Sequence, residues 1–188
     1  MVKPSTTRAA VIPALAEAFR THGFEGASMA VLQDATGLGR GSLYNFFPGG
    51  KDEMAQAVLE DIDDWFQLNV FGSLRAASGG NTAEARTSVA AMFTTVDNYF
   101  QSGQRVCLPG AFAVGRERDR FAIAVSAYFV EWIEVLTAAL VAMGHADARA
   151  IALRTIAAVQ GGIVLARALS DNTAFTSVLS AARAEAIL

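Results

Sequence analysis

A short segment near the N-terminus concentrates polar side chains of the kinds that contact nucleic-acid bases. Arg40 carries a guanidinium fork that can donate to O6 and N7 of guanine, and Asn45 carries an amide that can pair with adenine. Ser42 and Tyr44 lie between them, with hydroxyls suited to bases or phosphates. Gly41 has no side chain, which lets the backbone approach a groove closely. This combination predicts a surface that reads double-stranded DNA.

Two short helices are expected to position these side chains. Apolar spacing and capping residues predict helices over residues 29–36 and 40–46, separated by a turn that contains Gly37. Such a pair forms a helix-turn-helix, which places its second helix in the major groove. Ser28 and Lys51 lie at the N-termini of helices, where backbone amides and positive charge suit phosphate groups.

Helical periodicity dominates the 188 residues, and strand-type alternation is nearly absent. The first helix is expected over about residues 6–22, with Pro13 kinking it or delaying its regular start and Gly23 ending it. A long helix is expected from Lys51 to about Ala76. Further helices are expected at about 82–102, 110–116, 119–143, 147–170 and 172–186. The pattern predicts an all-α fold.

The stretch from Phe19 to Met54 resembles the DNA-binding head of the TetR family of bacterial repressors. Its glycines, serine, leucine-tyrosine pair, phenylalanine and lysine follow the family's order and spacing over about residues 6–58. Gly39 and Phe46 depart from that pattern, which often has a polar residue and a histidine at these positions. The Pro48–Lys51 segment, with the later Cys107–Gly110, resembles a branch whose members include flavonoid-responsive repressors.

The resemblance implies a three-helix helix-turn-helix head in residues 1–50 and a helical ligand-binding and dimerisation bundle in residues 51–188. It assigns base contacts to Arg40, Gly41 and Ser42, and phosphate contacts to Ser28, Tyr44 and Lys51. The full set of expected DNA contacts is Ser28, Arg40, Gly41, Ser42, Tyr44, Asn45 and Lys51.

The family resemblance also implies an effector cavity in the body, which would be mostly apolar. An aromatic and apolar set at helical spacing fits such a cavity, although it fits an ordinary core as well. The residues expected to line the cavity are Met92, Phe93, Val96, Phe100, Cys107, Phe112, Phe129 and Trp132.

The last two helices are expected, from the family's four-helix bundle, to join two copies of the chain. Their small and apolar residues also fit packing within one chain. The expected interface residues are Ile151, Thr155, Val159, Gly162, Ile163, Ala166, Phe175, Val178 and Leu179.

The distribution of charge and the number of cysteines indicate what kind of partner and which compartment to expect. Residues 1–51 carry five basic and three acidic residues (+2), and the remainder carries ten and fifteen (-5). The mildly basic head suits a polyanion. A single cysteine fits the reducing cytoplasm. The two histidines are far apart in the sequence, so no cluster of metal ligands is expected. The sequence contains no cofactor fingerprint. It also contains no run of 18 apolar residues, so no membrane span is expected.

Two functions remain open at this point. The first is a cytoplasmic, homodimeric, non-enzymatic transcriptional regulator, a repressor released from a palindromic operator by a small apolar or aromatic effector. The alternative is a helical small-molecule-binding protein or enzyme whose head no longer binds DNA. The sequence shows no nucleophile and base pair that favours an enzyme.

Overall fold

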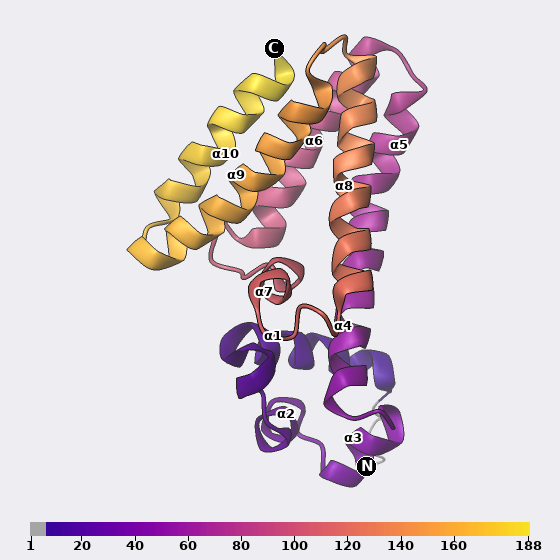
Figure 1. The fold of residues 1–188 in the computed structure, drawn as a ribbon, viewed down its shortest axis with the longest axis vertical. Helices are drawn as coiled ribbons and strands as arrows, with labels where there is room; N and C mark the ends of the chain where they lie inside the picture. The colour runs from indigo at the N-terminus through magenta and orange to yellow at the C-terminus, as the bar shows by residue number, and fades with distance from the viewer. Residues whose placement is uncertain (1–6) are drawn as a thin grey trace, which may run out of the picture. The chain divides into compact units, whose positions relative to one another are not determined.

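The chain folds into helices joined by turns, as the computed structural model shows for residues 7–188 (Figure 1). These residues form no strand, which confirms the predicted all-α class. The expected start of the first helix at Thr6 lies outside the described residues. The elements are α1 (Arg8–Gly26), α2 (Met29–Thr36), α3 (Arg40–Phe46), α4 (Lys51–Phe66), the π-helical turn η1 (Gln67–Phe71), α5 (Gly72–Ser78), α6 (Thr82–Phe100), α7 (Leu108–Val114), α8 (Ala122–Ala142), α9 (Ala148–Leu169) and α10 (Asn172–Ile187).

The chain forms two compact units, each assembled from two segments. The head unit ends its first segment at Asp63 and also includes Leu108–Val125. The body unit consists of Asp64–Cys107 and Ser126–Leu188. The head unit therefore extends beyond the residues 1–50 expected from the sequence. Both α4 and α8 begin in the head unit and end in the body unit.

Aromatic packing on α1 forms the core of the head unit. Phe19 and Phe24 are each only 1% exposed, and their rings stack with centroids 6.0 Å apart. Phe112 of α7 meets the ring of Phe24 edge-on at 6.0 Å, and Phe121 does so at 5.3 Å. Edge-to-face and offset pairs at these distances are favourable beyond the area they bury. Residues 108–121 therefore complete the core beside α1.

Helix ends in the head follow the glycine and capping residues. Ser28 caps α2 and Gly37 ends it in a left-handed conformation, which gives the predicted range. Gly23, with φ +67°, breaks α1 where an end was expected, although helical geometry resumes for three more residues. Pro13 lies inside α1, which begins at Arg8, so the proline does not delay the start of the helix.

Close packing of α9, α10 and α6 shapes the body unit. Phe175 of α10 is fully buried and lies against two glycines. A Cβ at Gly162 would lie 2.9 Å from the Phe175 ring, and a Cβ at Gly103 would lie 2.8 Å from Phe175 Cβ. Gly103 also has φ +88°, which residues other than glycine rarely adopt. Both glycines are therefore required by the packing of one aromatic ring.

A π-helical turn interrupts the long helix expected over residues 51–76. In this turn the backbone N–H of Gly72 donates to the carbonyl of Gln67, five residues earlier. A Cβ at Gly72 would lie 3.0 Å from that carbonyl oxygen, so glycine allows the close approach. The turn buries the adjacent residues Val70 and Phe71 together. Single π turns inside α-helices are frequent at functional sites.

Two helices of the described chain, α8 and α9, are long and apolar enough to cross a membrane by length and composition alone. Core helices of soluble proteins meet the same criterion, and each helix buries part of its surface in the protein. This observation therefore gives little support to a membrane location.

Candidate nucleic-acid interface

Helix α3 presents the predicted base-reading residues on its outer surface. Arg40, Gly41, Ser42 and Asn45 are exposed. Leu43, between them, is 0% exposed and anchors the helix to the head core. One buried side chain therefore fixes the helix while its polar side chains stay available to a partner.

Tyr44 is half-buried and has two close neighbours. The Arg40 guanidinium lies 5.6 Å from the centroid of the Tyr44 ring, one helical turn away. A Cβ at Gly50 would lie 3.4 Å from Tyr44 Cε1 and 3.7 Å from its hydroxyl oxygen, both ordinary contact distances. Gly50 has φ +68°, so the turn beside this ring favours glycine.

Ser28 is exposed at the start of α2, where it acts as a helix cap. Its Oγ accepts a hydrogen bond from the backbone N–H of Val31 at 3.3 Å. The hydroxyl can still donate its own proton, because a serine hydroxyl both accepts and donates. The contact with DNA expected for this residue is therefore compatible with its capping role.

Lys51 makes an intramolecular contact that the sequence did not suggest. Its Nζ donates to the Phe24 carbonyl oxygen at 2.9 Å and lies 4.3 Å from the centroid of the Phe24 ring. The ammonium group has three donors, so two remain for a phosphate. Lys51 thus joins the start of α4 to the end of α1, in addition to the phosphate contact expected of it.

Acidic residues in the first turn of α4 have partners within the head. Asp52 accepts from Arg120 Nη1 at 2.8 Å, and Glu53 accepts from the Gly49 backbone N–H at 2.7 Å. The Arg8 guanidinium lies 3.7 Å from the second Glu53 oxygen. Carboxylates beside a DNA surface would repel phosphates, and these contacts offset their charge. No local pattern in the sequence points to Arg120, which lies 68 residues from its partner.

Family models match both parts of the chain. The family described as "Bacterial regulatory proteins, tetR family" matches residues 11–58, and "Transcriptional regulator LmrA/YxaF-like, C-terminal domain" matches residues 85–181. The second match alone spans more than half of the chain. This chain belongs to the TetR family. It is a DNA-binding transcriptional regulator with a helix-turn-helix head.

Solved structures share the fold of this TetR-family regulator. A TetR regulator from Legionella pneumophila is 21% identical, with a TM-score of 0.77 and coverage of 96% of this chain and 97% of that one. Reduced NemR from E. coli is 18% identical (TM-score 0.73, coverage 93% and 94%). A CifR cysteine mutant is 22% identical (TM-score 0.73, coverage 97% and 98%), and that protein was solved with a 26-base-pair operator DNA. No curated protein matches the chain.

The residues expected to line the effector cavity fall in both units of this TetR-family regulator. The four positions on α6, together with Cys107 and Trp132, are buried in the body, and Phe129 is half-buried. Phe112 instead belongs to the head unit, where it contacts Phe19 and Phe24. Phe93 also borders a surface groove of about 200 Å³ in the body. Other residues lining that groove are Thr94, Asp97, Thr176, Leu179, Ser180 and Arg183.

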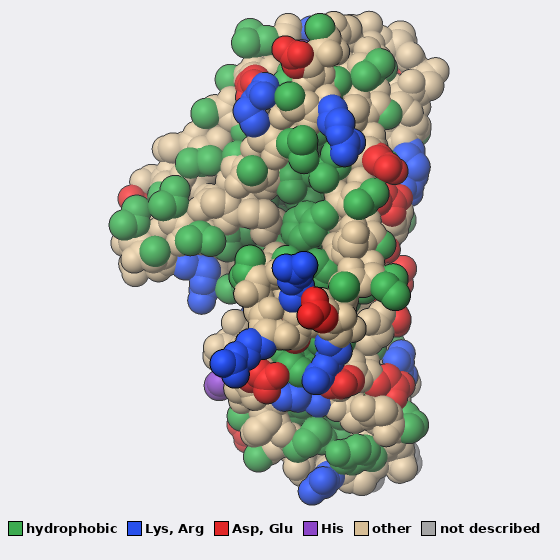
Figure 2. Space-filling view, viewed as in Figure 1, with side chains coloured by type: hydrophobic (Ala, Val, Ile, Leu, Met, Phe, Trp, Pro, Cys, Tyr) green, Lys and Arg blue, Asp and Glu red, His purple; other side chains and the backbone are tan. Residues whose placement is uncertain are grey.

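The residues expected at a dimer interface are mostly inside the single chain. Every one except the half-buried Val178 is buried, and Phe175 fills the space between α9, α10 and Gly103. Most of these side chains are therefore covered within one chain, where α9 packs against α10. The opposite face of α9 carries exposed apolar residues, namely Leu153, Val164 and Leu165. Figure 2 shows apolar side chains at the surface of this helix pair. Because both faces of α9 are apolar, the hydrophobic pattern of the sequence could not show which face is buried within the chain.

A metal site finds no support in the part of the chain that the structure describes. No group of three or more histidine, cysteine, aspartate or glutamate side chains is placed to hold a metal ion there.

Proposed function

We propose that the protein is a ligand-responsive repressor that binds a palindromic operator as a homodimer. The observation that carries this proposal is the exposed polar surface of α3. The buried side chain of Leu43 anchors this helix in the head core, and the chain belongs to the TetR family. Arg40, Gly41 and Ser42 contact base edges, and Asn45 adds an amide donor and acceptor. Ser28, Tyr44 and Lys51 contact phosphates.

The proposed dimer uses the exposed face of α9. Leu153, Val164 and Leu165 are 46%, 65% and 45% exposed, which is costly for side chains of this size in water. Ala157 and Gly161 lie on the same face, and their small size allows a second helix to approach closely. Two heads separated by one turn of DNA would then read the two halves of a palindrome.

The proposed effector is a small, largely apolar or aromatic molecule that binds in the body unit. It must bind the DNA-released conformation more tightly than the DNA-bound one, because equal affinities shift no equilibrium. The protein acts in the cytoplasm and has no enzymatic role in this proposal. The resemblance to flavonoid-responsive repressors stays a prediction.

The direct test is binding to a labelled DNA fragment that flanks the protein's own gene, measured by fluorescence anisotropy across a salt series. We expect tight binding to one short palindrome that weakens steeply as salt rises. Arg40→Ala should cost about 1–3 kcal/mol of binding free energy, the typical value of a bidentate base contact. Arg118→Ala is the matched control, because this arginine is exposed and lies off α3.

Equal losses for Arg40→Ala and Arg118→Ala would contradict the assignment of α3 as the reading helix. Weak binding of the wild-type protein to every fragment, followed by failure to select any site from random DNA, would favour the alternative function. In that case the head would be a helical cap on a small-molecule-binding protein.

A further inference from the structure

The first turn of α4 carries charges that oppose the phosphate contact proposed for Lys51. Lys51 supplies one positive charge to this turn, whereas Asp52 and Glu53 supply two negative charges. Carboxylates at the start of a helix are favourable for the helix itself, because they complement its dipole. The same carboxylates repel a phosphate group that approaches Lys51. A phosphate contact at this turn therefore needs positive charge from other parts of the head unit.

Arginines from two other segments supply this charge. The Arg8 guanidinium of α1 lies 3.7 Å from Glu53, and Arg120 Nη1 donates to Asp52 Oδ1 at 2.8 Å. Arg120 comes from the segment between α7 and α8, which the head unit includes. With both arginines in place, the charge around the first turn of α4 changes from net negative to net positive. The contact of Arg120 is the shorter of the two.

The ring of Phe24 brings the charge of Arg120 close to Lys51. Lys51 Nζ lies 4.3 Å from the centroid of this ring, and Arg120 Cζ lies 5.1 Å from the same centroid. The two cations are therefore less than about 10 Å apart, which is about the Debye length at 0.1 M salt. Charges at this separation still act on one another through water. Arg120 and its partner Asp52 thus belong to the electrostatic surroundings of Lys51.

The contact between Arg120 and Asp52 is on the surface of the head unit. The two side chains are 49% and 54% exposed. Exposed ion pairs add little to the stability of a fold, because water already solvates both charges. Loss of this pair would therefore change the charge beside Lys51 much more than it would change the folding of the head.

We propose that Arg120 is a positioning residue for DNA binding, which holds the Asp52 carboxylate and cancels its charge beside Lys51 without contacting DNA itself. This inference rests on the proposed phosphate contact of Lys51 and adds to it a residue from outside the helix-turn-helix. Phosphate contacts carry no sequence information, so Arg120 raises the affinity for double-stranded DNA of any sequence.

The experiment measures binding of the full-length protein to a labelled double-stranded oligonucleotide of arbitrary sequence, by fluorescence anisotropy at low salt. Arg120→Gln should bind about twofold to fivefold more weakly than wild type, as one uncompensated charge near a phosphate allows. This difference should shrink as salt rises, because salt screens exposed charges. Adding Asp52→Asn to Arg120→Gln should restore the wild-type affinity. The melting temperature of Arg120→Gln should stay close to that of wild type.

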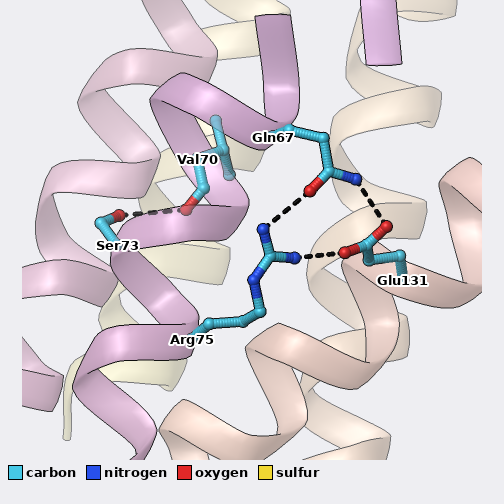
Figure 3. Close-up of polar contacts among 5 residues, drawn as sticks. All are labelled: Gln67, Val70, Ser73, Arg75 and Glu131. Carbon is cyan, nitrogen blue, oxygen red and sulfur yellow. Dashed lines mark hydrogen bonds and ion pairs between the residues drawn. The ribbon is translucent and has the colours of Figure 1, made fainter. Parts of the chain in front are cut away.

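Two further variants are matched controls. Arg118→Gln removes the same charge two residues away, from a side chain that pairs with Asp119. Figure 3 shows another arginine–carboxylate contact between distant parts of the chain, that of Arg75 with Glu131 in the body unit. Arg75→Gln therefore removes an ion pair of the same kind outside the head. Both controls should change DNA affinity less than Arg120→Gln does.

Three results would overturn the proposal. The first is equal affinity of Arg120→Gln and wild type, and the second is an equal loss in Arg120→Gln and both controls, which would indicate an effect of net charge alone. The third is a loss that Asp52→Asn does not restore, which would show that Arg120 contacts DNA directly.

Asp52→Asn alone keeps the test decisive if Arg120→Gln does not fold. It should bind the oligonucleotide about twofold to fivefold more tightly than wild type, because the charge of Arg120 is then no longer cancelled. Unchanged or weaker binding would reject the inference. Absence of DNA binding by the wild-type protein would reject the proposed function and this inference together, whereas the other adverse results reject the inference alone.

Discussion

Lys51 Nζ donates a hydrogen bond to the carbonyl oxygen of Phe24, 27 residues earlier in the chain. This contact connects the first residue of α4 to the end of α1, and a phosphate contact is proposed for the same lysine. It predicts that Lys51→Met lowers the free energy of unfolding by about 1.5–3 kcal/mol, the usual value of a charged hydrogen bond. It also predicts that the slope of log binding constant against log salt falls by about 0.9, because one phosphate contact is lost.

Urea unfolding and the DNA salt series measure these two effects separately. A purely structural lysine would change the unfolding curve and leave the salt slope of binding unaltered. A lysine that only contacts phosphate would show the reverse.

Gly50 provides the second prediction. Its φ of +68° makes any side chain unfavourable there, whereas a Cβ would only reach ordinary contact distance, 3.4 Å, from a Tyr44 ring carbon. Gly50→Ala should cost about 1–2 kcal/mol, the typical penalty of a left-handed conformation for other residues. Gly41→Ala is the control, because its Cβ meets nothing within 4 Å and alanine favours a helix. Chemical denaturation should rank Gly50→Ala well below wild type and Gly41→Ala at or above it.

The exposed face of α9 gives a prediction about assembly. Val164→Glu with Leu153→Glu should convert the proposed dimer to a monomer, because two carboxylates would be buried without partners. Light scattering measures the mass. Leu68→Glu is the control, since Leu68 is also exposed, at 82%, but lies on the π turn. Unchanged mass in the double variant would move the interface elsewhere on the chain.

Asp171 links the stability of α10 to pH. Its carboxylate accepts from the Thr173 hydroxyl at 2.7 Å and from the Thr173 backbone N–H at 2.9 Å, and these hydrogen bonds hold its pKa below the usual range. A lowered pKa in the folded state stabilises the protein above the unfolded pKa of about 3.9, and the effect disappears as pH falls through the folded value. Wild type should therefore exceed Asp171→Ala in melting temperature at pH 7, with the gap closing toward pH 3. A constant gap across this range would show that ionisation is irrelevant.

Local signals in the sequence were sufficient for the helix-turn-helix. Ser28, Gly37 and the polar run after Gly39 each act within a few residues, so the bounds of α2 and α3 followed from capping and turn chemistry alone. The family resemblance then identified the same segment as the DNA-binding head, in agreement with the match over residues 11–58.

Long-range contacts account for what the sequence did not predict. Phe112 belongs to the head because Phe19 and Phe24 pack around it, although a long stretch of chain separates it from them. The two faces of α9 are both apolar, so only the position of α10 decides that Val159 is buried and Val164 is exposed. The burial of Trp132 likewise depends on distant neighbours such as Phe66, whose ring centroid lies 5.3 Å away.

The π turn at Gln67–Phe71 also makes the chain tolerant of a change in length. An α-helix rotates by about 100° per residue, so one deleted residue normally turns every later side chain away from its place. A π turn holds one residue more than the α-helix it interrupts. Removing the exposed Leu68 would let the turn relax to ordinary α-helix, with Leu74 and Ala77 still facing inward. The helix can therefore lose one residue at this point without changing which of its later side chains face the core.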